Sequence, residues 1–253
     1  MEDLAIIILA AGKGSRMKSD LAKVLHPVAG KSMVVHVAGC AKKVTKDVHV
    51  VVGHQAQQVK DEVSRFFQVS FALQEQLLGT GDAVKSALPG LASHIQNVLV
   101  LCGDVPLIQT ETLESLIKAH GESRANLSVL AVTLKDPNGY GRIVFDTSGR
   151  LTAIREEGDA NDAELMINLV NSGIYCFDKT FLKTAIEKIG NDNSQAEYYL
   201  TDLVEIAVAQ NEKTCVLSLD DPGQVIGVNT LKDLARAEAL FQSSVGESSV
   251  IHK

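Results

Sequence analysis

A glycine-containing loop near the amino terminus holds the residues whose types best suit phosphate chemistry. It follows a short apolar run and reads Leu-Ala-Ala-Gly-Lys-Gly-Ser-Arg-Met over residues 9–17. Gly12 and Gly14 allow the backbone to approach a ligand, so that its N–H groups can face phosphate oxygens. Arg16 and Lys23 add positive charge downstream, as a polyphosphate requires. The pattern indicates a phosphate-binding loop, whereas the glycines alone fit an ordinary turn between a strand and a helix equally well.

Two common nucleotide-binding motifs do not fit this loop. The G-x-G-x-x-G fingerprint of dinucleotide-binding enzymes requires a third glycine, where this chain has Met17. The P-loop pattern ends in Gly-Lys-Ser, which occurs at residues 30–32, but Leu25 occupies the position of its first glycine. A hydride-transferring dehydrogenase and a P-loop kinase are therefore both disfavoured.

Polar residues also follow two later apolar runs. Gln74 ends one run, and Gly79 and Thr80 open the next helix with free N–H groups and a side chain for paired hydrogen bonds. Gly103 and Asp104 end another run, where a carboxylate suits Mg²⁺, a hard cation that keeps most positions for phosphates and water. The simpler interpretations are Thr80 as a helix cap and Asp104 as a turn residue.

Alternating strand-like and helix-like segments must position these residues. Strands are predicted at residues 4–9, 48–52, 69–73 and 98–102, with helices between them at 33–44, 56–67 and 82–88. This alternation predicts a Rossmann-like α/β fold, with a mixed, mostly parallel sheet and helices on both faces. Ligands of such sheets bind beyond the carboxyl ends of the strands. The loops after Leu9, Leu73 and Cys102 are therefore expected to form the site.

The second half of the sequence predicts a mixture of strands, a hairpin and helices. These elements are strands at 127–134 and 169–177, a hairpin at 139–156, and helices capped by Thr110 and Asp178 or spanning 200–209 and 231–240. From Gln242 the sequence is polar and rich in Ser, which predicts a fraying tail over residues 242–253.

Composition predicts a globular protein without a nucleic-acid or membrane partner. The chain has 253 residues, 45% of them hydrophobic and 22% charged, which suits one large α/β domain. A net charge of −7 argues against a general nucleic-acid binder. No apolar run approaches the roughly 20 residues that span a bilayer, and Glu2 and Asp3 stand where a signal peptide would be positive. Scattered cysteines predict free thiols in a reducing cytoplasm.

Taken together, the motifs resemble the signature of sugar-1-phosphate nucleotidyltransferases. The resemblance rests on the loop at 9–17, Ala-Lys-Val-Leu-His at 22–26, Leu-Gly-Thr-Gly-Asp-Ala at 78–83 and Leu-Cys-Gly-Asp-Val-Pro-Leu at 101–107. Within that family, the set is most similar to the uridyltransferase half of the bifunctional uridyltransferase/acetyltransferases. The resemblance implies a nucleotide-diphospho-sugar transferase fold and Mg²⁺-dependent uridylyl transfer from UTP to N-acetylglucosamine 1-phosphate. The implied product, UDP-N-acetylglucosamine, serves peptidoglycan and cell-wall biogenesis.

The resemblance also implies roles for individual residues. The implied catalytic residues are Arg16 and Lys23, and the implied metal ligands are Asp104 and Asn229. The implied nucleotide-binding residues are Leu9, Ala10, Ala11, Gly12, Gly14, Gln74, Gly79, Thr80 and Gly103. The implied sugar-binding residues are Gly141, Glu156 and Asn171. Plainer interpretations are a helix cap for Asn229, a hairpin turn for Gly141 and a solvated strand position for Glu156.

The family pattern implies a domain over residues 1–241, with a nucleotide-binding part at about 1–108 and a sugar-binding part at about 109–229. Leu77 stands where a second Gln is usual, Cys102 where a Tyr is common and Gly158 where a Lys is common. These departures leave open a relative that uses another sugar or nucleotide, or a non-catalytic nucleotide-sugar-binding regulator. No hexapeptide repeat of the acetyltransferase half occurs here, so the sequence is expected to carry the uridyltransferase step alone. It leaves the oligomeric state open.

Overall fold

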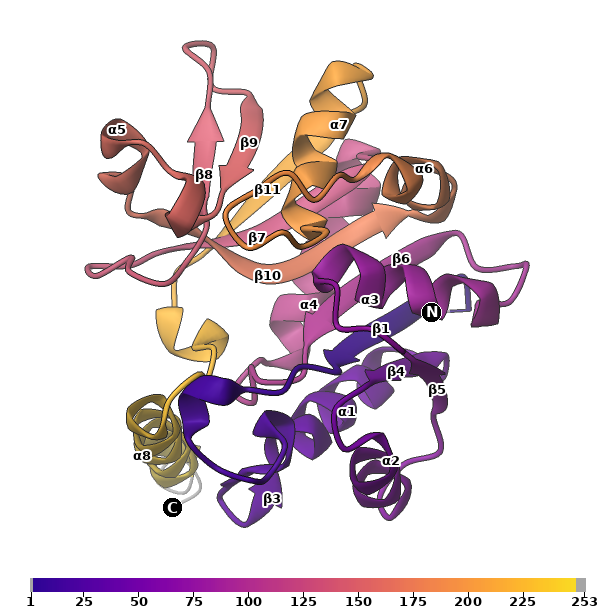
Figure 1. The fold of residues 1–253 in the computed structure, drawn as a ribbon, viewed down its shortest axis with the longest axis vertical. Coiled ribbons are helices and arrows are strands. Elements are labelled where there is room, and N and C mark those ends of the chain that lie inside the picture. The colour runs from indigo at the N-terminus through magenta and orange to yellow at the C-terminus, as the bar shows by residue number, and fades with distance from the viewer. Residues whose placement is uncertain (1, 249–253) are drawn as a thin grey trace.

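The centre of the protein is one sheet of nine strands (Figure 1). The computed structural model describes residues 2–248, and of residues 244–248 it describes the backbone alone. The main strand order is β11-β7-β10-β6-β1-β4-β5, and β8 and β9 extend from β10 as a hairpin. The strands of this sheet are β1 (Leu4–Ala10), β4 (Val48–Val52), β5 (Ser70–Leu73), β6 (Asn97–Cys102), β7 (Leu127–Thr133), β8 (Arg142–Phe145), β9 (Leu151–Arg155), β10 (Leu169–Asp178) and β11 (Thr214–Leu219).

Helices and short turns connect these strands. The α-helices are α1 (Met33–Val44), α2 (Ala56–Ser64), α3 (Thr80–Ala87), α4 (Thr110–Ser123), α5 (Asp162–Leu165), α6 (Lys179–Ala185), α7 (Leu203–Ala209) and α8 (Leu231–Ser248). The short 3-10 helices are Ser15–Met17, Lys23–Leu25, Leu88–Gly90, Glu157–Asp159, Ile186–Lys188, Leu200–Asp202 and Pro222–Val225. A separate two-stranded sheet pairs β2 (Pro27–Val28) with β3 (Lys31–Ser32).

The predicted mixed, mostly parallel sheet is confirmed. β1 pairs in parallel with β4 and β6, β4 with β5, and β11 with β7. β10 lies between β6 and β7 and is antiparallel to both. Four of the six strand pairs along the main order are therefore parallel, and β10 is the strand that makes the sheet mixed.

Both faces of the sheet are covered by helices, also as predicted. Along β1, Ile6 and Ile8 belong to the core that includes the buried faces of α1, α2 and α4. Ala5 and Ile7, which point to the opposite face, belong to the core that includes α3, α6 and α7. A strand buried on both faces reads as an unbroken apolar run, which is what the sequence of β1 shows.

The carboxyl ends of β1 and β6 lie side by side in the sheet. The two strands are parallel, and Leu9 near the end of β1 is paired with Cys102 at the end of β6. Ligands of open α/β sheets bind beyond the carboxyl ends of such strands. The loop of residues 11–23 leaves β1 at this point, and Gly103 and Asp104 follow β6.

The observed elements differ from the sequence predictions at several points. Thr110 begins α4 but does not cap it, because the residue that flanks the helix is Gln109. The edge strand β11 was not predicted, because most of its residues are only partly buried and its pattern is weak. α2 ends at Ser64, three residues before its predicted end at Phe67. The chain from Gln242, which was predicted to fray, is the last part of α8, and this helix continues to Ser248. Residues 249–253 lie outside the described part of the chain.

α8 is ordered because one face of it packs on a small separate core. Ala237 is buried there against Met17 and Met33, and Leu234 and Phe241 pack beside it. The apolar spacing of three to four residues gives the helix a continuous face toward the domain. Within residues 2–248, no helix combines the length and apolar character needed to cross a bilayer.

Candidate active site

A cleft of about 230 Å³ lies at the carboxyl ends of β1 and β6. All three loops that the sequence placed at the site contribute to it. Its lining residues are Leu9, Ala11, Gly12, Lys23, Val24, Gln74, Leu77, Gly79, Thr80, Ala83, Cys102, Asp104 and Glu197. The structure therefore brings most of the predicted nucleotide-binding residues into one space. Val24 and Ala83 also line the cleft, although no role was predicted for either of them.

The charged residues predicted for catalysis and metal binding meet beside this cleft. The Lys23 ammonium forms an ion pair with Asp104 Oδ2 and donates a hydrogen bond of 3.1 Å to Asn229 Oδ1. Arg16 donates to the same Asn229 oxygen at 3.0 Å. The Lys23 and Asp104 side chains are only 17% and 16% exposed, so little water screens their attraction. The fold thus brings together two cationic side chains and two side-chain oxygens that come from three distant parts of the chain.

Gly14 is needed where the phosphate loop passes Lys23. Its φ is 67°, in the left-handed region that non-glycine residues rarely adopt. A Cβ on Gly14 would also overlap the Lys23 Cβ. Gly14 therefore does not line the cleft itself but allows the backbone to lie against the Lys23 stem.

Gly103 plays a similar part between the two strands. Its N–H donates to the Leu9 carbonyl at 2.9 Å, and a Cβ there would lie 2.9 Å from that same oxygen. The buried Ala10 side chain would be 3.4 Å from it. A glycine at 103 therefore lets the ends of β1 and β6 stay close, immediately before Asp104.

Asn229 is fixed by the start of α8. The Asp233 carboxylate accepts from the backbone N–H groups of Asn229 and Thr230, at 3.2 and 2.8 Å. The Thr230 hydroxyl in turn accepts from the Asp233 N–H at 3.2 Å. This reciprocal cap replaces the predicted interpretation of Asn229 as the capping residue. The Thr-x-x-Asp spacing at 230–233 is the sequence signal that would have shown it.

The side of the cleft formed by β5 and α3 carries Gln74 and Thr80. Gln74 is 4% exposed, and its Nε2 donates to the Gly79 carbonyl at 3.0 Å and to Asp82 Oδ2 at 2.8 Å. The Thr80 hydroxyl oxygen accepts from the Leu200 N–H at 3.0 Å rather than capping its own helix, whose first flanking residue is Gly79. The simple interpretation of Thr80 as a helix cap is therefore wrong.

The three predicted sugar-binding residues also lie together. The Asn171 N–H donates to the Gly141 carbonyl at 2.8 Å. A Cβ on Gly141 would lie 3.4 Å from Glu156 Oε1, which accepts from the Thr201 hydroxyl at 3.3 Å. Burial raises the pKa of Glu156, the Thr201 hydrogen bond opposes this, and the charge of Asp159 adds to it. Glu156 is thus a half-buried acceptor with a side-chain partner, in contrast to the solvated strand residue of the plainer interpretation.

Cys102 links this group to the nucleotide side. Its thiol donates to the Gly173 carbonyl at 3.4 Å, and the Gly173 N–H donates to Asn171 Oδ1 at 2.9 Å. Burial raises the pKa of Cys102 to about 12, so the group is a thiol and not a nucleophilic thiolate. Of the other departures from the family pattern, Leu77 lines the cleft and Gly158 packs on Ser194.

The side-chain oxygens of Asp104 and Asn229 are suitable ligands for a hard divalent cation. Asp104 Oδ2 and Asn229 Oδ1 both contact one positively charged atom, the Lys23 nitrogen, so their geometry already suits a shared cation. Mg²⁺ takes few protein ligands and leaves the rest to phosphate and water. No cluster of three or more His, Cys, Asp or Glu side chains able to hold a metal occurs in the part of the chain that the structure describes. A metal held here would therefore depend on the substrate for further ligands.

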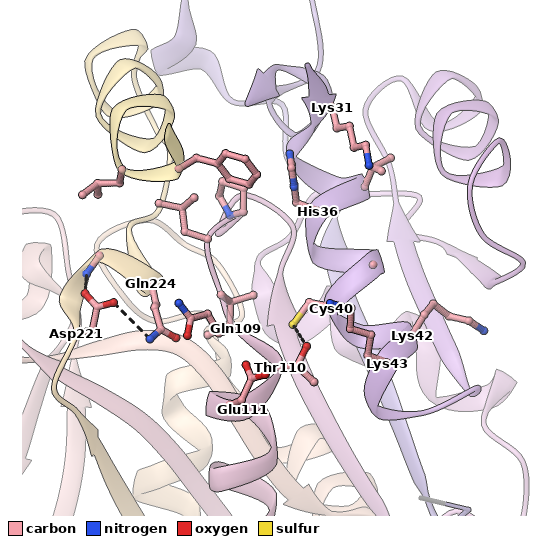
Figure 2. A pocket seen from close by; sticks show the side chains of 18 of the residues that line it. Lys31, His36, Cys40, Lys42, Lys43, Gln109, Thr110, Glu111, Asp221 and Gln224 are labelled. Atoms are coloured by element: carbon pink, nitrogen blue, oxygen red, sulfur yellow. Dashed lines mark hydrogen bonds between the residues drawn. The ribbon is translucent and has the colours of Figure 1, made fainter. Parts of the chain in front are cut away.

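A larger hollow of about 720 Å³ lies between α1, the start of α4 and α8. Figure 2 shows Cys40 and Lys43 of α1 facing Thr110 and Glu111 of α4, with Cys40 Sγ 3.6 Å from the Thr110 hydroxyl. None of the site residues predicted from the sequence lines this hollow. The smaller cleft is the candidate active site because cationic side chains, carboxylate and amide oxygens and glycine-containing loops meet there.

Comparisons with known proteins agree with this geometry. The family model described as nucleotidyl transferase matches residues 5–239. Bifunctional protein GlmU of Geobacter metallireducens is 50% identical over 238 residues, which cover 94% of this chain and 50% of that protein. The GlmU protein of Geotalea uraniireducens is 44% identical, with 99% of this chain and 55% of the relative covered. The chain spans about half the length of these curated relatives.

A solved structure shows the same fold. A protein described as a glucose-1-phosphate thymidylyltransferase of Bacillus anthracis superposes with a TM-score of 0.72 and covers 94% of each chain. Its sequence identity is 19%, so this likeness is one of fold alone. The family match over nearly all of the chain, together with the charged cleft, shows that the chain belongs to the nucleotidyl transferase family.

Proposed function

We propose that this chain transfers a uridylyl group from UTP to N-acetylglucosamine 1-phosphate, giving UDP-N-acetylglucosamine and pyrophosphate. The observation that carries the proposal is the meeting of Arg16, Lys23, Asp104 and Asn229 beside a cleft that also contains Gln74. Two cations beside two hard oxygen donors suit the joining of two anionic phosphates. Identity of 42–50% with GlmU proteins over nearly all of the chain supports the same assignment.

The reaction we propose is a single in-line displacement. A phosphate oxygen of the sugar 1-phosphate forms a bond to the α-phosphorus of UTP. The bond from that phosphorus to the bridging oxygen breaks, and pyrophosphate leaves with the electron pair. No general base is required because a phosphate monoester is already ionised near neutral pH. Catalysis then depends on positioning and on stabilising spread negative charge.

The residues of the cleft would divide these tasks. Arg16 and Lys23 would stabilise the charge that moves toward the departing pyrophosphate. Asp104 and Asn229 would hold Mg²⁺, which when bound offsets the repulsion between the two phosphate groups. The protonated Cys102 thiol takes no covalent part, because a thiol is a poor nucleophile.

Recognition of the two substrates would fall to opposite sides of the site. Backbone groups of the loop at 9–17 would cradle the triphosphate, and Gln74, Gly79 and Thr80 would contact uracil. Gly141, Glu156 and Asn171 would bind the amino sugar through its hydroxyl and amide groups. We also propose that the chain works in the cytoplasm, where its product would supply peptidoglycan synthesis.

A substrate panel with pyrophosphate release as the readout tests this function. We would combine UTP, CTP, GTP and dTTP with N-acetylglucosamine 1-phosphate or glucose 1-phosphate, with Mg²⁺ and with a chelator. UTP with N-acetylglucosamine 1-phosphate should be the best pair, and chelation should stop the reaction. Preference for another pair would identify a different transferase. Binding of UDP-N-acetylglucosamine without pyrophosphate release from any pair would identify a regulator.

Substitution of Asp104 tests the metal assignment directly. Asp104→Ala should abolish turnover and leave the protein folded, because the side chain is partly exposed and not part of the apolar core. Asp61→Ala on α2 is the matched control, since Asp61 is an exposed carboxylate away from the cleft. Full activity of Asp104→Ala in magnesium-containing buffer would show that the metal assignment is wrong.

A further inference from the structure

The Gln74 side chain is held by two acceptors. Its Nε2 donates to the Gly79 carbonyl at 3.0 Å and to the Asp82 carboxylate at 2.8 Å. A carbonyl and a carboxylate can only accept hydrogen bonds, so only the NH₂ end of the amide can face them. The orientation of the amide therefore follows from its partners. An amide NH₂ has two hydrogens, and both are used here.

The remaining polar atom of this side chain can only accept. Gln74 lines the cleft, and within residues 2–248 its Oε1 accepts no hydrogen bond from the protein. A ligand in the cleft must therefore offer a donor to this atom. Uracil presents its N3–H as a donor. The N3 of cytosine is an acceptor, and its lone pair would repel that of Gln74 Oε1.

The surroundings leave Gln74 little freedom to turn over. The side chain is 4% exposed, so a reversed amide would place its oxygen against the Gly79 and Asp82 oxygens without solvent to relieve the repulsion. The backbone around Gly79 is held by Tyr198, whose N–H donates to the Leu78 carbonyl at 2.7 Å and whose carbonyl accepts from the Gly81 N–H at 2.8 Å. Leu77 stands in the cleft where the family pattern has a second Gln, so no amide at that position can share the recognition.

We infer that Asp82 is a positioning residue that sets the nucleobase preference by fixing the orientation of the Gln74 amide. The inference rests on the proposed function and extends it to a residue that contacts Gln74 rather than the base. The Asp82 carboxylate accepts from the Gln74 amide on one side, while the base meets the other end of the same amide. Without that acceptor only the Gly79 carbonyl holds the amide, so the reversed orientation, which offers a donor to the N3 of cytosine, becomes more accessible.

The test compares UTP with CTP in wild type, Asp82→Ala and Asp82→Leu. The Leu variant keeps the approximate size of Asp82 but has no acceptor for the Gln74 amide, and it remains informative if Asp82→Ala fails to fold. The ratio of kcat/KM for UTP to that for CTP should fall by about tenfold in each, the effect of one orienting hydrogen bond. The KM for the sugar phosphate should stay at the wild-type value.

Asp61→Ala provides the matched control. Asp61 on α2 accepts from Gln57 Nε2 at 2.8 Å, which is the same kind of pair on an exposed surface outside the cleft. Its substitution should leave the UTP to CTP ratio unchanged. Wild-type selectivity in both Asp82 variants would overturn the inference while leaving the proposed function intact. A wild-type protein that uses no UTP would refute the proposed function instead.

Discussion

The backbone N–H of Val228 donates a hydrogen bond of 2.9 Å to the carbonyl oxygen of Asp104. This bond joins the loop that follows β6 to the segment that precedes α8. Asn229 is the residue after Val228. The distance between the Asp104 carboxylate and the Asn229 amide oxygen is therefore set by the backbone and not by flexible side chains alone. The pair proposed to hold Mg²⁺ is therefore positioned by the fold itself.

Loss of either cation beside this pair should impair turnover. Lys23→Ala and Arg16→Ala should each lower kcat by about 100-fold, the size of a lost charged contact to a developing anion. Steady-state pyrophosphate release at saturating substrate measures this, with Lys183→Ala, an exposed lysine of α6, as the control. Wild-type kcat in both variants would remove the phosphate-loop assignment.

Gly14→Ala should displace Lys23. The variant carries the cost of a left-handed residue, about 1–2 kcal/mol, and in addition places a Cβ against the Lys23 stem. Gly149→Ala separates the two effects, since Gly149 has φ of 80° but open space around it. Both variants should lose thermal stability, measured as Tm, but only Gly14→Ala should lose kcat. Equal kcat in the two variants would show that the contact with Lys23 is unimportant.

Asp233→Ala should weaken the hold on Asn229. The variant loses the cap of α8, worth about 1 kcal/mol, and frees the Asn229 backbone. Asp178→Ala removes a comparable cap from α6, where Asp178 accepts from the Phe181 N–H at 2.7 Å. Chemical denaturation should show similar losses of stability for both. Activity should fall in Asp233→Ala alone, and the Mg²⁺ concentration for half-maximal activity should rise; an unchanged Mg²⁺ requirement would contradict this.

Asp202 should make the protein less stable as the pH rises. Burial raises the pKa of Asp202 to about 6, Glu205 adds to this, and Arg155 opposes it. The folded state therefore binds this proton more tightly than the unfolded chain, whose Asp pKa is about 3.9. Its favourable contribution is complete below about pH 4 and is lost as the pH rises through about 6. Asp202→Asn should accordingly raise Tm relative to wild type at pH 7 and not at pH 4.

Thermal melts across this pH range measure the effect. The exposed Asp192→Asn provides a control in which no pH-dependent gain is expected. A gain in Tm for Asp202→Asn that is the same at pH 4 and pH 7 would mean that ionisation of Asp202 is not its cause.

Local sequence was sufficient to predict the most deeply buried strands and helices. β1 and β4 are short unbroken apolar runs, and α1 has apolar residues at helical spacing, so each was predicted close to its observed bounds. These patterns reflect burial that is nearly complete along the element. β11 was missed because its burial is partial and depends on pairing with β7, a strand distant in the chain.

For the site, the sequence by itself determined which chemical groups are present and near which strand ends they lie. The glycines at 12 and 14, the cations and Asp104 could all be identified from local patterns. Only the tertiary structure decided that Asn229 reaches Lys23, that Asp82 holds the Gln74 amide, and that Thr201 contacts Glu156. The reason is physical: a strand or loop is specified by its own residues, whereas a hydrogen bond between distant segments depends on how the whole sheet aligns their ends.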